Sequence, residues 1–141
     1  MYKESFIDNE IRKLALIFAR LMGLKADGKA DEFVQLADST LLNEYNIHWD
    51  ELPGMPLADF EALLQNSNYN ADKLDVLAQI LYLRTEPFEN IAGTFEILKK
   101  VLIVYDKLEQ QYHRQSLENI NKRNIINQFL DARLTAASAR E

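Results

Sequence analysis

The 141-residue chain contains no cysteine and has only two histidines, four glycines and three prolines. Without cysteine there is no disulfide framework, no thiol nucleophile and no thiolate ligand for a metal ion. So few glycines and prolines leave little turn chemistry for a sheet-rich fold, and their scarcity favours long helices. The motifs of glycine-rich phosphate loops are also absent from the sequence.

Long apolar runs are missing too, because no run approaches the roughly 18 residues that a membrane-spanning helix needs. The segment from Met1 to Ser5 carries two charges and lacks the basic, apolar and small regions of a signal peptide. We therefore expect a cytoplasmic protein without a membrane partner. The absence of cysteine is compatible with that location.

The net charge of −6 is unevenly distributed along the chain. Residues 1–98 carry 17 acidic and 8 basic side chains, whereas residues 99–141 carry 5 acidic and 8 basic ones. This basic excess near the C-terminal end is slight and dispersed, unlike the basic stripe typical of nucleic-acid-binding proteins. We predict no nucleic-acid partner.

Apolar residues recur at helical spacing in six segments, and no strand pattern competes with them. Asn70 and Ser116 are positioned to cap two of these helices, and Pro56 fits the start of a short one. The first predicted helix ends between residues 23 and 28, and the others cover residues 30–44, 56–64, 71–84, 89–111 and 117–137.

We expect one all-α domain over residues 1–141, with a small, polar tail that frays from about residue 136. The short turns predict about six antiparallel helices arranged as pairs, in a tetratricopeptide-repeat-like right-handed superhelix or a small bundle. The helix over residues 89–111 is apolar on two sides. It is therefore predicted to be central, with Leu98 and Leu102 in the core.

Two segments resemble parts of a tetratricopeptide repeat. From Gly28 to Leu41, a glycine turn precedes a helix, as in the second half of such a repeat, and Val101-Leu102 resembles the end of a second copy. The chain departs from the pattern at Phe33 and Thr40, where small residues are usual, and at Glu86-Pro87, where a glycine turn is usual.

Taken whole, the chain resembles a family of bacterial helical proteins of unknown function. The resemblance rests on Leu21-Met22-Gly23-Leu24-Lys25 at the end of the first helix, on the acidic helix that follows, on the helix over residues 72–83 and on the last helix after Ser116. It implies a short superhelix resembling helical repeats, and it implies no activity and no functional residues.

The sequence offers little for catalysis or for a metal site. Neither His48 nor His113 belongs to a metal-binding motif, and neither has a glutamate three residues before it, as a di-iron bundle requires. Because no nucleophile, base and orienting group can be assembled, we expect no enzyme, no cofactor and no metal. Paired acids at the predicted helix beginnings are explained by the helix dipole, namely Asp27/Asp31, Asp72/Asp75 and Glu86/Glu89.

Aromatic residues supply the candidate binding residues. Trp49 lies in a loop, and tryptophan is enriched at interfaces and in ligand pockets, although it could also cover the edge of the core. Tyr69, Tyr82, Tyr105 and Tyr112 could line a groove between the last three helices, or could end the core stripes. The candidate partner-binding residues are therefore Trp49, Tyr82, Tyr105 and Tyr112.

Three functional hypotheses follow from these observations. The first is a non-catalytic interaction or scaffold protein that holds a partner helix or peptide in a groove between antiparallel helices. The second is a homodimer formed by spare apolar faces on the first or fifth helix, because Leu16, Ile17 and Met22 lie outside the main stripe of the first. The third, an enzyme or small-ligand binder with a site near Trp49, is disfavoured.

Overall fold

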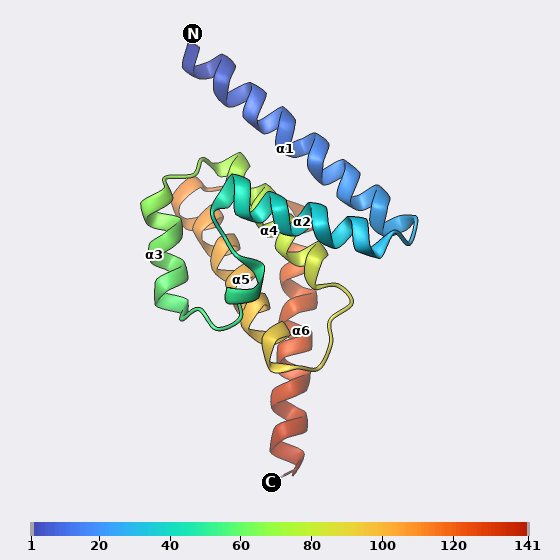
Figure 1. Ribbon diagram of the computed structural model, residues 1–141. Helices are drawn as coiled ribbons and strands as arrows, with labels where there is room; N and C mark the ends of the chain where they lie inside the picture. The colour runs from blue at the N-terminus through green and yellow to red at the C-terminus, as the bar shows by residue number, and fades with distance from the viewer. Residues whose placement is uncertain (1, 141) are drawn as a thin grey trace.

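The structure of the protein is a computed structural model, which describes the backbone of residues 2–140 and the side chains of residues 8–134. Helices make up 81% of the chain, and no strand occurs between residues 2 and 140, which confirms the all-α prediction. The elements, shown in Figure 1, are α1 (Tyr2–Ala26), α2 (Ala30–Tyr45), the 3₁₀ helix η1 (Trp49–Glu51), α3 (Leu57–Ser67), α4 (Ala71–Thr85), α5 (Ala92–Tyr112) and α6 (Leu117–Arg140).

The helix boundaries lie within three residues of the predicted ones, and local capping chemistry explains several of them. The Asn70 Oδ1 accepts a hydrogen bond from the backbone N–H of Lys73 (2.8 Å), and the Ser116 Oγ accepts one from the backbone N–H of Asn119 (3.0 Å). At their C-terminal ends, α2, α3 and α5 stop at residues with a left-handed backbone, namely Asn46, Asn68 and His113.

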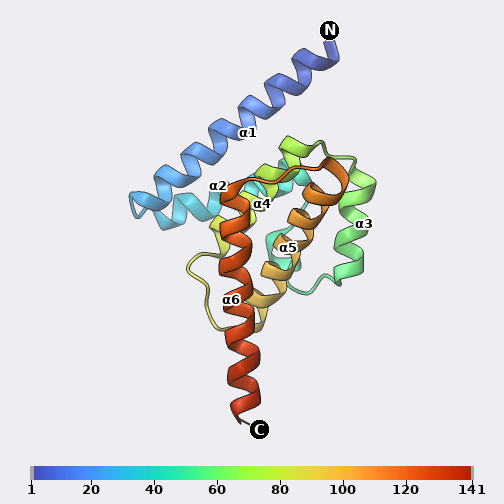
Figure 2. The same cartoon turned by 180° about the vertical axis from the view of Figure 1, so that it is seen from behind.

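Helices α4 and α5 form the central pair of a small bundle. The α1–α2 hairpin packs on α4, whereas α3 and α6 pack on α5, and Figure 2 shows α6 running beside α5 from behind. The N-terminal part of α1 and the C-terminal part of α6 extend beyond the bundle at opposite ends (Figure 1). None of the helices between residues 2 and 140 combines the length and the apolar character needed to cross a membrane.

The core of α5 differs from the prediction at one position. Leu98 is fully buried, as expected, but Leu102 is only partly buried. The fully buried positions of α5 centre on Val101, and successive residues of an α-helix are rotated by about 100°. Leu102 therefore lies at the edge of the buried face.

The predicted fraying from about residue 136 concerns residues whose side chains are outside the described part of the chain. The backbone of α6 is helical through Arg140, so this expectation stays a prediction. So does the finer expectation of a tetratricopeptide-like superhelix, because a small helical bundle accounts for the observed packing.

Candidate functional site

Trp49 is the first residue of η1, in the connection between α2 and α3. This connection is anchored by two fully buried side chains, Ile47 and Leu52, on either side of the tryptophan. Burial of these apolar anchors holds the connection against the bundle. Trp49 is consequently partly buried against the core, with the rest of its ring facing outward.

The Trp49 ring packs against the guanidinium of Arg84, which comes from the last turn of α4. The guanidinium carbon lies 4.5 Å from the ring centroid, within the range of a cation–π interaction. The Arg84 Nε also donates a hydrogen bond to the Asp38 Oδ1 of α2 at 2.9 Å. One ion pair and one aromatic ring therefore connect α2, η1 and α4.

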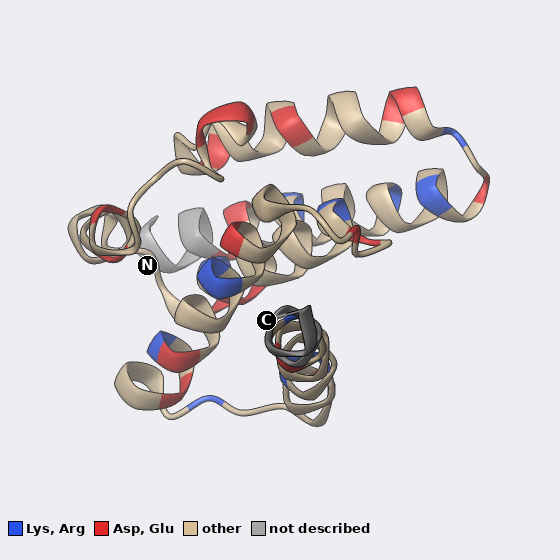
Figure 3. Cartoon of the chain, turned by 90° about the horizontal axis from the view of Figure 1, so that it is seen from below, with Lys and Arg blue, Asp and Glu red and all other residues tan. Residues whose placement is uncertain are grey.

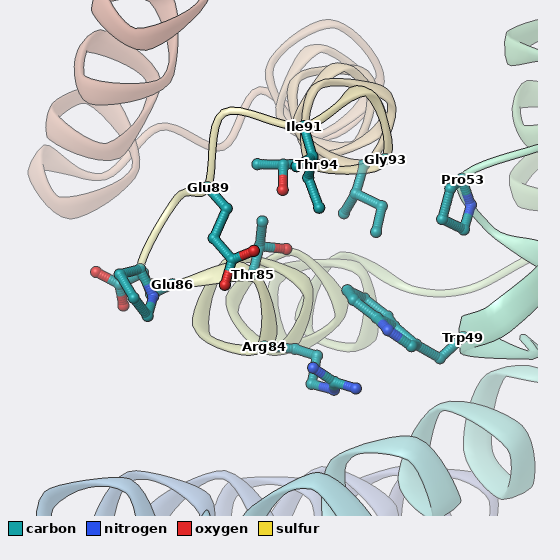
Figure 4. Close-up of a pocket in the computed structure, with 11 residues that line it drawn as sticks. Trp49, Pro53, Arg84, Thr85, Glu86, Glu89, Ile91, Gly93 and Thr94 are labelled. Atoms are coloured by element: carbon teal, nitrogen blue, oxygen red, sulfur yellow. The ribbon is translucent and has the colours of Figure 1, made fainter.

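A hollow of about 320 Å³ lies on one side of this arrangement. It is bordered by Trp49 and Pro53 at one end, by the end of α4, by the connection over residues 86–91 and by the start of α5 (Figure 4). Its polar side chains are those of Arg84, Thr85, Glu86, Glu89 and Thr94.

A second hollow, of about 340 Å³, is also lined by Trp49. Its other lining residues come from α2, from η1 and from the residue before η1, and they are Asp38, Ser39, Leu42, His48, Asp50 and Glu51. Helix α2 carries acidic side chains and no lysine or arginine (Figure 3). We refer to the cavity beside Arg84 and Glu89 as the first Trp49 hollow and to the one beside Asp38 and Asp50 as the second.

The two hollows together carry a clear excess of negative charge. Five carboxylates line them, against the single arginine, and that arginine is already paired with Asp38. The Glu86 Oε1 lies 4.0 Å from the Lys25 Nζ. Burial lowers the pKa of Lys25, and the nearby carboxylate of Glu86 partly opposes that shift. No described side chain forms an ion pair with Glu89, Asp50 or Glu51.

The positions of Glu86 and Glu89 correct one interpretation of the sequence. The dipole of a helix beginning at residue 89 was expected to explain these acids, but α5 begins at Ala92 and has no acidic residue in its first turn. Glu86 is instead the C-terminal cap of α4, where the helix dipole disfavours a carboxylate. Both residues lie in the connection that lines the first Trp49 hollow.

Tyr82 and Tyr105 lie in the core between α4, α5 and α6, with exposed fractions of 4% and 1%. Side chains of α6 cover their rings: the Lys122 Nζ lies 5.0 Å from the Tyr82 centroid, and the guanidinium carbon of Arg123 lies 5.7 Å from the Tyr105 centroid. Burial raises the pKa of both tyrosines. Helix α6 thus occupies the space where the sequence predicted a groove.

Tyr112 belongs to a chain of tyrosine hydroxyls that donate to backbone carbonyls. Tyr112 donates to Tyr69 (2.7 Å), Tyr69 donates to Tyr45 (2.8 Å) and Tyr45 donates to Lys73 (2.7 Å). These bonds connect the ends of α2 and α5 with the start of α4. None of the three candidate tyrosines lines either Trp49 hollow, so the structure does not bring them together with Trp49.

The histidines and acids form no metal centre among residues 8–134, where no three of them converge. His48 lines the second Trp49 hollow, and His113 ends α5 with a left-handed backbone. The hollows combine an aromatic ring, aliphatic walls and carboxylates, which is chemistry suited to binding. Asp38 and Arg84 were missed at the sequence level because 46 residues separate the pair and no local pattern connects them.

Comparison of the chain with models of protein families, with curated proteins and with solved structures finds no match in any of the three.

Proposed function

We propose that the protein is a non-catalytic interaction module that binds a segment of a partner polypeptide at the two Trp49 hollows. The observation that carries this proposal is that the only tryptophan of the chain lines two cavities of more than 300 Å³ each. Binding pockets are concave, and they combine aromatic and aliphatic walls with a few polar groups. Tryptophan is among the residues that contribute most to binding energy at protein interfaces.

Two exposed aliphatic side chains also favour this surface as the binding site. Leu42 is 40% exposed and lines the second hollow, whereas Ile91 is 55% exposed and lines the first. Together with Trp49 they offer apolar surface on both sides of the Asp38–Arg84 ion pair. A partner segment that spans both hollows would remove this apolar surface from water.

The proposed binding surface differs from the groove that the tyrosines favoured, because α6 fills that space. It remains a surface between helices, formed by α2, α4, the start of α5 and η1. Cytoplasmic location and the absence of membrane and nucleic-acid partners are part of this proposal. So is the resemblance to bacterial tetratricopeptide-like proteins, which the α1–α2 and α4–α5 pairs support.

A site-specific photo-crosslinker tests the proposal in the cells that naturally make the protein. Benzoylphenylalanine replaces Leu42 or Ile91 in the hollows, or Leu117 as a control that is 75% exposed and lines neither hollow. The expected result is one discrete crosslinked partner from the first two positions and none from the control. Identical patterns from all three positions, or no crosslink from the hollows, would contradict the proposal.

Self-association is the second candidate function, and one observation favours it. On α1, Leu16 is 72% exposed and Met22 is 47% exposed, whereas α5 carries no exposed large apolar side chain. Of the two helices considered for a homodimer, the spare apolar surface therefore lies on α1. Exposed apolar patches of this kind are common at interfaces between copies of a chain.

A further inference from the structure

We propose that the partner segment inserts a lysine or arginine side chain into the first Trp49 hollow, with its cationic end at Glu89. This inference rests on the proposed function, because it names the chemistry of the partner that the same surface binds. Three features carry it: the apolar walls of the hollow, the direction of the Glu89 carboxylate and the prior pairing of Arg84.

The walls fit the stem of a long basic side chain. Trp49 and Pro53 border one end of the hollow, whereas Ile91, just before α5, and Ile97 of α5 contribute aliphatic surface. Lysine and arginine carry long aliphatic stems that pack on apolar surface while their charged ends reach a polar group. The volume of about 320 Å³ accommodates one such side chain together with water.

The negative charge of the hollow favours a positively charged ligand. Figure 4 shows the Glu89 side chain extending from the connection toward Thr85, between the ends of α4 and α5. No described cation pairs with Glu89, so its carboxylate is available to a cationic group from outside the chain. A charge-assisted hydrogen bond to that carboxylate would be stronger than a neutral one.

An anionic partner is disfavoured, although Arg84 also lines the hollow. The Arg84 guanidinium already donates to Asp38 and packs on Trp49, so it is held in place by groups of this chain. An incoming carboxylate or phosphate would meet the carboxylate of Glu89, and like charges repel each other. The second hollow strengthens the same preference through Asp50 and Glu51.

Short synthetic peptides measure this preference directly. The probe is acetyl-Gly-Leu-Lys-Leu-Gly-amide, and two counterparts carry norleucine or glutamate in place of the lysine. Binding is followed through the fluorescence of Trp49, which reports on the hollows because it is the only tryptophan. We expect saturable binding of the lysine peptide, with the norleucine and glutamate peptides at least about tenfold weaker. Added salt should weaken the binding because partly exposed charges are screened.

Variants locate the preference within the hollow. Glu89→Gln keeps the shape of the side chain and is expected to weaken the lysine peptide about twofold to fivefold without changing the norleucine peptide. Glu61→Gln is the matched control, because Glu61 is an exposed glutamate on α3 outside both hollows and the same charge is removed. It should leave both affinities unchanged. Circular dichroism of each variant verifies that the fold is intact.

The failures of this inference and of the proposed function are distinguishable. Equal binding of the lysine and norleucine peptides, unaffected by Glu89→Gln, would overturn the cationic preference while leaving a polypeptide-binding surface in place. Equal losses from Glu89→Gln and Glu61→Gln would overturn it as well, because the effect would then reflect net charge alone. If no peptide changes Trp49 fluorescence and no crosslink forms from residues 42 and 91, both proposals fail.

Discussion

Lys100 is a buried ammonium with little to compensate its loss of water. The side chain is fully buried in α5, and its Nζ donates to the backbone oxygen of Glu96 in the preceding turn at 3.3 Å. No described carboxylate lies within ion-pair distance of it. We predict that Lys100→Met stabilises the protein at pH 7, because methionine retains an unbranched apolar stem and removes the charge.

The expected gain in the free energy of unfolding is about 1–2 kcal/mol. A buried polar group left short of partners costs about 1–3 kcal/mol, and charged groups cost more. The single long hydrogen bond to Glu96 recovers part of that cost, and the methionine side chain fills nearly the same space. The expected gain therefore lies in the lower part of the range of about 1–3 kcal/mol.

The gain should depend on pH in a defined direction. Burial lowers the pKa of Lys100 from its ordinary value of 10.5, and the carboxylate of Glu96 partly opposes that shift. Between the lowered pKa and pH 10.5 the unfolded chain binds more protons than the folded one, so stability from this group rises with pH. The advantage of Lys100→Met is consequently largest below the lowered pKa and shrinks toward pH 10.5. The raised pKa values of Tyr82 and Tyr105 reduce stability above pH 10, but they do so in both proteins and cancel in the difference.

Urea unfolding followed by circular dichroism at several pH values measures the difference. The matched control is Lys99→Met, because the neighbouring lysine side chain is 45% exposed and makes only a surface ion pair with Glu96. Its effect should stay within about 0.5 kcal/mol, as is usual at the surface. Destabilisation by Lys100→Met of more than about 1 kcal/mol, or equal effects of the two variants, would refute the claim that the Lys100 ammonium is desolvated.

Three further predictions concern packing, association and the tyrosine chain. Leu98→Ala should cost about 2–5 kcal/mol of unfolding free energy and Leu102→Ala only about 1–2 kcal/mol, and equal losses in urea unfolding would contradict the burial pattern of α5. Light scattering should give twice the 16.4 kDa mass of one chain, reduced to one chain by Leu16→Glu, whereas 16.4 kDa at every concentration would exclude the dimer. Tyr112→Phe should cost about 0.5–1.5 kcal/mol through loss of its bond to the Tyr69 carbonyl, and no loss in urea unfolding would show that water replaces it.

The helices were predictable because their signals are local. A helix period needs only a few neighbouring residues, and the caps at Asn70 and Ser116 act within three positions of the chain. The central position of α5 also follows from its two apolar stripes. These features depend on residues that are close in sequence, so they required no knowledge of the packing partners.

The tyrosines were ambiguous because each has an apolar body and a polar tip. The sequence pattern alone does not decide whether such a ring faces a groove or ends a core stripe. The structure places Tyr82 and Tyr105 under α6, since Lys122 and Arg123 of that helix pack over their rings.

The burial of Lys100 could have been predicted from the sequence spacing, because Lys100 lies between Ile97 and Val104 on the buried side of α5.

The Trp49 surface shows why a binding site is harder to predict than a fold. Arg84 and Asp38 meet only because α4 packs against α2, and no sequence pattern near either residue predicts that they form an ion pair. The local signals were Trp49 in its loop and the pair Glu86 and Glu89, for which a helix beginning at residue 89 offered a structural explanation. Since α5 begins at Ala92, neither carboxylate belongs to its first turn, and Glu86 opposes the dipole of α4. Glu86 has the Lys25 ammonium of this chain at 4.0 Å, whereas no described cation pairs with Glu89, and the lysine or arginine proposed for the partner would supply one.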